Sequence, residues 1–420
     1  MKAVISNRIY IEIDNKLGKE LRDKLTYRVP TYGDGPPMIV HNYRAFRSNV
    51  LSIPAGRADL IPDDYEIVDK RILKPLEFPD FNGKLRESQQ DIHDSVDDNC
   101  LINAKVGWGK TFMALALARK LGQKTIVVVH TLPLMYQWAE EVEKVFGFKP
   151  SLIGGGHDAS NMPITIGNVA SLYKRMDKLG KEFGTLIMDE VHHAPSPTFT
   201  RIIDCCFARY KIGLSGTLQR KDGLHVLLPD YFGYKVYTPA IENTMVPTIH
   251  AYHTGILLPY GDIWAHRVND LNSTPEYQLC VVDKILEYEK AGHKVLFLAD
   301  RVDFLKFVAR CSGAGIIIGE TEERKEEFAK LDRGEINSLC GTTAIFKEGI
   351  SYNPFSCVIL GSPINNEPML EQIIGRIQRL YPDKLPPVVV DLILQGRTGE
   401  NQFNNRQGFY MKAGFKIKYL

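Results

Sequence analysis

Short apolar runs alternate with longer amphipathic segments from about residue 97 onward. Apolar residues at consecutive positions are typical of parallel strands that are buried on both faces. The first series of expected strands is CLINA (100–104), TIVVVH (125–130), ITIG (164–167), TLIMDE (185–190) and KIGLSG (211–216). Between the first two lies TFMALALARKLG, in which Ala and Leu favour a helix and Gly122 favours its end. This alternation predicts a doubly wound parallel α/β sheet.

A second series of apolar runs begins near residue 294 and predicts another α/β domain of the same class. Its expected strands are KVLFLA (294–299), AGIIIG (314–319), SLCGT (338–342), CVILG (357–361) and VVVDLI (388–393). Residues 218–285, which lie between the two series, contain prolines and aromatic residues but few regular periods. We expect them to form a linker region attached to the first sheet.

The first part of the chain has a different pattern. RIYIEI alternates between apolar and polar positions, LTYRVP and NVLSIP predict further short strands, and Pro/Gly clusters such as YGDGPP separate them. These features predict a small β-rich module. The expected division of the chain is therefore a β-rich module over 1–78, an α/β domain over 79–240, a linker region over 241–285 and a second α/β domain over 286–420.

Composition excludes several classes of protein. An apolar content of 44% and a charged content of 24% are ordinary for a globular protein, and a net charge of +2 excludes a globally basic nucleic-acid coat. The seven cysteines are scattered and lack Cys-x-x-Cys spacing, which indicates neither a disulfide framework nor a zinc site. No apolar run approaches the roughly 18 residues that span a bilayer, and the N-terminus has no signal-peptide core. We expect a cytoplasmic protein.

Residues 103–111 read NAKVGWGKT, and the stretch from Ala104 to Thr111 fits the pattern of a phosphate-binding loop. The loop is expected between a strand and a helix, where backbone N–H groups and the helix dipole bind phosphates. Lys110 would then bridge the β- and γ-phosphates of ATP, and the Thr111 hydroxyl would ligate Mg²⁺. The other residues expected to contact the nucleotide through this loop are Val106, Gly107, Trp108 and Gly109.

Trp108 occupies a position in this loop where a small residue is usual. Because the loop binds phosphate through backbone N–H groups, a large side chain is tolerable if it points away from the nucleotide. Gly107 and Gly109 are intact on either side. We therefore expect the indole to face the cleft between the two α/β domains.

The expected strand TLIMDE ends in two carboxylates. Asp189 is placed to hold Mg²⁺ through water, and Glu190 is placed to orient and deprotonate the attacking water. An Asp-Glu pair after four apolar residues is otherwise simply a strand that emerges into solvent. Its position some eighty residues after the phosphate loop favours the catalytic interpretation. His192 and His193 follow on the same expected strand and would face opposite ways, so packing or coupling is favoured over a metal site.

The segment MLEQIIGRIQRLY in the second series carries three further candidate catalytic residues. Helical spacing would place Gln372, Arg376 and Arg379 on one stripe. A separate apolar stripe would be formed by Ile373, Ile377 and Leu380. Two arginines on a polar stripe are usually a solvated face, but charge that develops on a γ-phosphate is commonly stabilised by an inserted arginine. If these arginines belong to the second domain, hydrolysis requires the two domains to close.

At this point the motifs resemble those of superfamily 2 helicases, in order over about residues 84–395. LRESQQ resembles the segment whose glutamine reads adenine, which implies a nucleotide-binding role for Gln89 and Arg86. SGT (215–217) resembles the motif that couples hydrolysis to movement. The remaining matches are AKVGWGKT and DEVH for the first two motifs, VVVHTLPLMYQW and ITIGNVASLYK for strand-contacting segments, and GTTAIFKEGIS and QIIGRIQR for the fifth and sixth motifs.

Within that superfamily the DEVH box, the LRxxQ segment and GLSGTLQRKDG are most similar to phage DNA helicases that anneal, branch-migrate and remodel forks. Trp108 and the SGT triplet depart from the common pattern. The resemblance implies two RecA-like domains that use ATP and Mg²⁺, an N-terminal DNA-binding module, and single-stranded, forked or branched DNA as the partner of a monomer. An RNA helicase with the same core, or a nucleotide-gated clamp that does not move, are the alternatives.

Nucleic-acid contacts are expected where basic and aromatic residues lie together without acids. Residues 35–58 contain no acid, and residues 401–420 show the same composition; solvated surface elements are the alternative in both places. In the first segment the candidate contacts are Arg44, Arg47 and Arg57. By resemblance, contacts to a strand's backbone are implied for Thr131, Asn168, Lys174 and Thr342.

Overall fold

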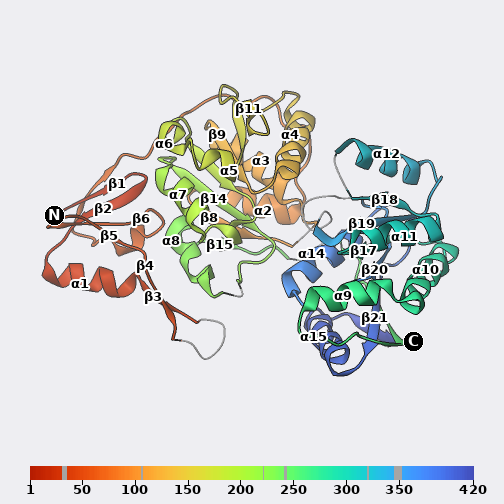
Figure 1. The fold of residues 1–420 in the computed structure, drawn as a ribbon. Helices are drawn as coiled ribbons and strands as arrows, with labels where there is room; N and C mark the ends of the chain where they lie inside the picture. Colours follow the sequence, from red (N-terminus) through yellow and green to blue (C-terminus); the bar gives the residue numbers. More distant parts are fainter. Residues whose placement is uncertain (31–35, 106, 221, 241–243, 319–320, 345–351) are drawn as a thin grey trace. The chain divides into compact units, whose positions relative to one another are not determined.

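The computed structural model forms two units, Met1–Ala240 and Ile241–Leu420 (Figure 1). It describes residues 1–30, 36–105, 107–220, 222–240, 244–318, 321–344 and 352–420. The expected fold class is confirmed, because each unit contains a parallel sheet with helices on its faces. None of the helices in the described part of the chain is long and apolar enough to cross a membrane.

The first unit begins with a small β-rich module. Its five-stranded sheet has the order β5-β6-β2-β1-β7, and β3 pairs with β4 in a separate antiparallel sheet. The helix α1 (Asn15–Lys24) is capped by the Asp14 side chain, which accepts a hydrogen bond from the Leu17 N–H. The strands are β1 (Lys2–Ile5), β2 (Arg8–Glu12), β3 (Thr26–Val29), β4 (Met38–His41), β5 (Arg44–Arg47), β6 (Val50–Pro54) and β7 (Glu66–Asp69).

The rest of the first unit is an eight-stranded sheet of order β11-β10-β12-β9-β13-β14-β8-β15, in which β11 alone is antiparallel. Its strands are β8 (Cys100–Asn103), β9 (Thr125–Val129), β10 (Ser151–Gly154), β11 (His157–Asp158), β12 (Ile164–Asn168), β13 (Thr185–Met188), β14 (Tyr210–Ser215) and β15 (Val236–Tyr237). Its α-helices are α2 (Glu87–Ser95), α3 (Lys110–Leu121), α4 (Leu132–Phe146), α5 (Val169–Leu172), α6 (Met176–Leu179), α7 (Pro197–Cys205) and α8 (Leu228–Phe232). All five strands of the first expected series are present.

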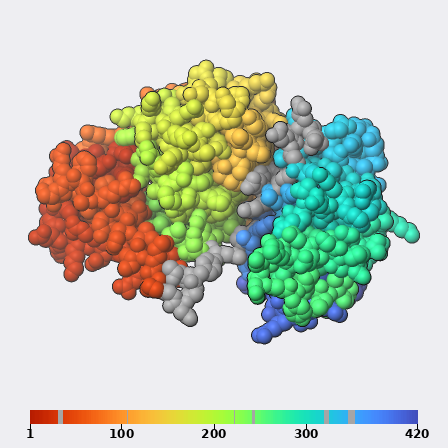
Figure 2. Space-filling view, in the orientation of Figure 1, coloured from red at the N-terminus to blue at the C-terminus, as the bar shows by residue number. Residues whose placement is uncertain are grey.

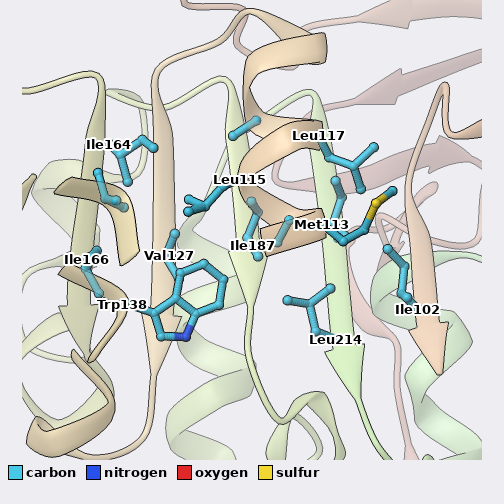
Figure 3. Packing of buried hydrophobic residues seen from close by; sticks show 14 of the residues in the cluster. Ile102, Met113, Leu115, Leu117, Val127, Trp138, Ile164, Ile166, Ile187 and Leu214 are labelled. Atoms are coloured by element: carbon cyan, nitrogen blue, oxygen red, sulfur yellow. The ribbon is translucent and has the colours of Figure 1, made fainter. Parts of the chain in front are cut away.

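The helix α3 lies on the sheet and fills the centre of the first core. Met113 and Leu115 of this helix pack on Val127 and Ile187 of the central strands, and Trp138 of α4 closes the same cluster (Figure 3). The helix ends at Gly122, whose φ of +58° is the left-handed conformation that glycine adopts without strain. Each buried side chain of this kind contributes about 1.5–3 kcal/mol to folding, so the core fixes α3 and the loop that precedes it.

The second unit is a seven-stranded sheet of order β18-β19-β17-β20-β21-β16-β22, in which every pair is parallel. Its strands are β16 (Thr248–Leu257), β17 (Val295–Ala299), β18 (Gly315–Ile317), β19 (Ser338–Thr342), β20 (Cys357–Leu360), β21 (Val388–Gln395) and β22 (Lys416–Tyr419). Its helices are α9 (Trp264–Ser273), α10 (Pro275–Lys290), α11 (Val302–Ser312), α12 (Thr321–Asp332), α14 (Glu367–Ile377) and α15 (Arg397–Lys412). The second expected series of strands is therefore also present.

The segment 241–285 is not a linker region attached to the first sheet. Thr248–Leu257 forms β16, which lies between β21 and β22 in the second sheet, and the segment continues into α9 and α10. The sequence does not indicate this strand as part of the second sheet, because its buried and less buried positions alternate over most of its length and its β21 partner comes about 140 residues later in the chain. The second unit thus begins well before residue 286.

Candidate nucleotide and nucleic-acid sites

The phosphate loop lies between the end of β8 at Asn103 and the start of α3 at Lys110, which is the context expected for it. The Lys110 ammonium donates a hydrogen bond to the Ala104 carbonyl at 2.9 Å. Gly107 and Gly109 both have φ of +89°, so a side chain at either position would be strained. Thr111 lies in the first turn of α3. Val106 is outside the described residues.

The expectation that Trp108 faces an interdomain cleft is wrong. Its side chain is 4% exposed and belongs to the core cluster of the first α/β domain. The indole N–H donates a hydrogen bond to the Ser88 hydroxyl of α2 at 3.2 Å. The indole is therefore buried against α2 of its own domain.

Arg86 and Gln89 lie beside the phosphate loop rather than open to solvent. The Gln89 side-chain amide donates a hydrogen bond to the Trp108 carbonyl at 2.9 Å, and the Arg86 guanidinium donates to the same oxygen. The Gln89 side-chain oxygen accepts from the Arg86 backbone N–H at 3.0 Å. Both ends of the buried Gln89 amide are therefore engaged in holding the loop, and a contact with adenine stays a prediction.

Asp189 and Glu190 follow the end of β13 in the same sheet. One Asp189 oxygen accepts from the Trp138 indole N–H at 2.9 Å, and the other accepts from the Glu190 backbone N–H at 2.9 Å. Glu190 has φ of +48°, a conformation that costs a residue with a side chain on the order of 1–3 kcal/mol and is commonly retained at functional sites. The fold therefore fixes both carboxylates at the carboxyl edge of the sheet.

Burial and neighbouring charges shift the pKa values of both Asp189 and Glu190. Burial raises the pKa of Asp189, and the adjacent Glu190 carboxylate adds to that rise. Burial also disfavours the charged form of Glu190, but His192 and the Lys110 ammonium outweigh it and lower the pKa of Glu190. Because Lys110 favours the ionised form of both groups, the loop lysine and the carboxylate pair form one electrostatic unit.

His192 links the carboxylates to the SGT triplet. Its Nδ1 lies 3.3 Å from a Glu190 carboxylate oxygen and 2.9 Å from the Ser215 hydroxyl. His192 and His193 lie in a short 3₁₀ turn (Val191–His193), and their ring centroids are 4.3 Å apart, so they do not face opposite ways as expected from a strand. This contact is compatible with coupling and with packing, and the coupling role stays a prediction.

The three candidate residues of the second unit do not share one helical stripe. Gln372 and Arg376 lie on α14, but the helix ends at Ile377, and Arg379 follows it in an isolated β-bridge with Thr244. Leu380, expected in the apolar stripe, is 54% exposed because the helix has ended before it. The buried apolar positions of this stripe are therefore Ile373 and Ile377.

The Arg379 guanidinium has few hydrogen-bond partners among the described residues. One of its terminal nitrogens donates to the Asn353 side-chain oxygen at 3.3 Å, whereas its Nε is buried and has no hydrogen-bond partner among the described residues. Burial lowers the pKa of Arg379. Lys384 donates to the Arg379 carbonyl at 2.8 Å and so fixes the backbone there. The hydrogen-bond partner of this guanidinium among the described residues is the neutral Asn353 side chain.

Two of the residues expected to contact a nucleic-acid strand, Asn168 and Thr131, lie together at the carboxyl ends of β12 and β9. Asn168 pairs in register with Val129, so it lies beside the start of α4, where the Thr131 hydroxyl caps the helix. Asn168 caps α5 by accepting from the Ala170 N–H at 3.0 Å. Lys174, shortly after α5, is exposed. In the second unit, Thr342 ends β19 and most of the GTTAIFKEGIS segment lies outside the described residues.

The arginines of the N-terminal module differ in their exposure. Arg47 is exposed on β5 beside Phe46, and Arg44 is mostly exposed although one of its nitrogens lies 2.6 Å from Asp204. Arg57 is buried, and its guanidinium pairs with Asp59 and Asp230 at 3.0 Å. The expected DNA contact of Arg57 is therefore corrected to a structural role. Arg406 in the C-terminal segment is likewise buried and paired with Asp391.

Two buried carboxylates join the module to the α/β domain that follows it, and Figure 2 shows the two surfaces meeting, red against yellow-green. Asp204 of α7 pairs with Arg8 at 2.9 Å. Asp230 of α8 accepts hydrogen bonds from Arg57, Tyr27 and Asn42. Buried charges that are paired and hydrogen-bonded in this way fix the relative position of the parts that carry them.

Replacing Asp230 with alanine is expected to lower the free energy of unfolding by about 3 kcal/mol, because the Arg57 guanidinium loses a buried partner and keeps only the more exposed Asp59. Urea denaturation followed by circular dichroism measures this. Asp97→Ala, which removes an exposed partner of Lys235, is the control and should change little. A loss below about 1 kcal/mol for Asp230→Ala would contradict a stabilising role for this pair.

A phosphate loop and a carboxylate pair on one parallel sheet, followed by a second parallel α/β unit, define a P-loop nucleoside triphosphatase with two RecA-like domains. The family described as "Type III restriction enzyme, res subunit" matches residues 80–220, and "Helicase conserved C-terminal domain" matches residues 278–381. The chain is 42% identical to probable helicase D10 of Escherichia phage T5, over 99% of this chain and 95% of that protein. It belongs to the superfamily 2 helicases and hydrolyses ATP as they do.

Two further comparisons agree with this assignment. The chain is 35% identical to "DNA 3'-5' translocase XPB2" of Sulfurisphaera tokodaii, over 42% of this chain and 41% of that protein. The solved structure of S. cerevisiae Dbp5 bound to RNA and ADP BeF3 matches with a TM-score of 0.56 and 13% identity, over 80% of this chain and 90% of that chain. The latter likeness concerns the fold alone.

Proposed function

We propose that the protein is a DNA-stimulated ATPase that translocates on DNA to unwind it or to migrate branches in replication, recombination or repair. The observation that carries this proposal is the placement of Lys110 at the start of α3 and of Asp189 and Glu190 directly after β13, on one and the same sheet. A clamp that only binds nucleotide needs no carboxylate to activate water. DNA is favoured over RNA because the similar protein of S. tokodaii is described as a DNA translocase.

The proposed roles in catalysis fall on seven residues of the two units. Lys110 contacts the β- and γ-phosphates, and the Thr111 hydroxyl and Asp189 hold Mg²⁺; a hydroxyl and a carboxylate are the hard oxygen donors that this ion prefers. Glu190 orients and deprotonates the attacking water. In the second unit, negative charge that develops on the γ-phosphate is stabilised by Gln372, Arg376 and Arg379.

The proposed contacts are with the sugar-phosphate backbone of the DNA, and binding is therefore largely independent of the DNA sequence. In the first unit they come from Thr131, Asn168 and Lys174, with Arg44 and Arg47 on the N-terminal module. Thr342 supplies one from the second unit. Neutralising phosphates releases counterions, so affinity falls steeply as salt concentration rises. A flat salt response would place the nucleic-acid groove elsewhere.

A comparison of substrates tests the proposed function. Steady-state ATPase rates are measured with no nucleic acid and with single-stranded, duplex, forked and four-way DNA, each beside matched RNA. We expect stimulation by DNA, with displacement or exchange of strands on forked and four-way DNA. Stimulation by RNA alone would favour the RNA-helicase alternative. Nucleotide binding without stimulated phosphate release would favour the clamp.

A further inference from the structure

Trp138, the last residue of the expected strand-contacting segment VVVHTLPLMYQW, contacts the proposed metal ligand Asp189. Trp138 lies on α4 and is 1% exposed, and its indole N–H donates a hydrogen bond to an Asp189 oxygen at 2.9 Å. In Figure 3 the ring packs below Val127, with its nitrogen on the side away from that residue. The apolar part of the ring thus belongs to the core, while its one polar atom is directed to the carboxylate.

This hydrogen bond fixes the orientation of the Asp189 carboxylate. The second Asp189 oxygen accepts from the Glu190 backbone N–H, so each oxygen has one donor that is held by buried structure. A carboxylate whose two oxygens are both held by fixed donors keeps one orientation, as ligating carboxylates in metal sites commonly do. Partners of this kind commonly change metal affinity or activity by about 10–100-fold when they are removed.

We propose that Trp138 is a positioning residue that orients Asp189 for the metal ion and connects this site to the strand-binding edge of the first sheet. The connection is α4 itself, which begins after Thr131 and carries Trp138 seven residues later, at a rise of about 10 Å along one rigid helix. A bound DNA strand that moves α4 through its contact with Thr131 would therefore change the contact between Trp138 and Asp189. This inference rests on the proposed roles of Asp189 and Thr131.

Trp138→Phe tests the inference, because it keeps an aromatic ring in the core and removes the N–H. Mn²⁺ binding in the presence of saturating ADP, measured by electron paramagnetic resonance, should weaken by about tenfold. ADP binding without metal should be unchanged. In ATPase assays the Mg²⁺ concentration for half-maximal rate should rise while kcat at saturating Mg²⁺ falls less, and the factor by which DNA stimulates hydrolysis should decrease.

Two controls separate positioning from lost packing. Val142→Ala removes a buried side chain one turn further along α4 and should lower stability without changing Mn²⁺ affinity. Trp264→Phe changes an exposed tryptophan of the second unit and should alter neither quantity. If Trp138→Phe does not fold, 3-benzothienylalanine at position 138 keeps the size of the indole and lacks its N–H, and the same weakening of Mn²⁺ binding is expected.

The outcomes distinguish this inference from the proposed function. Asp189→Asn should abolish Mn²⁺ binding, and retained binding in that variant would overturn the metal assignment itself. If Asp189→Asn loses Mn²⁺ but the folded Trp138 variants keep wild-type affinity, the positioning role is overturned and the metal assignment stands. Weaker Mn²⁺ binding with unchanged stimulation by DNA would overturn the connection through α4.

Discussion

Replacing Arg379 with alanine is expected to lower kcat for ATP hydrolysis by about 10³- to 10⁵-fold, the range over which an inserted arginine accelerates phosphoryl transfer. The physical reason is the state of its guanidinium, whose Nε is buried without a hydrogen-bond partner among the described residues and whose pKa is lowered by burial. This Nε can donate to a phosphate oxygen, and such charge-assisted hydrogen bonds are among the stronger ones in proteins. Steady-state phosphate release at saturating ATP and DNA measures the effect.

Two variants serve as controls for this result. Arg333→Ala removes a guanidinium of the same unit that pairs with Glu326 and Glu335 at the surface, and it should leave kcat unchanged. Arg379→Lys keeps the charge but loses the planar fork of donors, so partial activity is expected. A loss of less than about tenfold for Arg379→Ala would show that this residue does not stabilise the transition state.

Lys110→Ala is expected to lower the rate of ATP turnover by roughly 10²- to 10³-fold or more, while the fold stays intact. Among the described residues its ammonium makes one hydrogen bond, to the Ala104 carbonyl at 2.9 Å, so the substitution breaks no ion pair there. The phosphates lose their positive partner, and Asp189 and Glu190 lose the charge that favours their ionised forms. Phosphate release and thermal unfolding, measured on the same preparation, separate chemistry from stability.

A matched substitution lies on the same helix. Arg119→Ala removes an exposed guanidinium of α3 that pairs with Asp80, and turnover should be unchanged. Retained DNA-dependent hydrolysis in Lys110→Ala would refute the assignment of residues 104–111 as the phosphate loop. A loss of helical circular dichroism in that variant would instead contradict the argument that this lysine has no structural role.

The sequence predicts those parts of the structure that depend on local pattern. The strands are continuous apolar runs, and the phosphate loop and the carboxylate pair both lie where a strand ends. The orientation of Trp108 in its loop could not be predicted because it depends on Ser88 of α2, a partner twenty residues away in the chain. The burial of Arg57 depends on Asp230, which lies 173 residues later in the chain.

The end of helix α14 does have a local signal in the sequence. The stripe of Gln372, Arg376 and Arg379 assumed that the helix continues through Leu380. Pro382 follows closely, and helices commonly end before the residue that precedes a proline. The helix ends at Ile377, so Arg379 is placed by a β-bridge and not by helical spacing.

Asp204 and Asp230, the buried carboxylates that pair with the N-terminal module, limit which experiments can test the function of that module. A chain shortened to remove residues 1–78 would leave Asp204 and Asp230 without Arg8 and Arg57, so lost activity would report on a damaged α/β domain and not on a missing DNA contact. Charge reversal at the exposed Arg47 avoids this problem because that side chain lies outside the ion-paired interface. Deletion of the module thus tests the stability of the α/β domain, whereas substitution of Arg47 tests a contact with DNA.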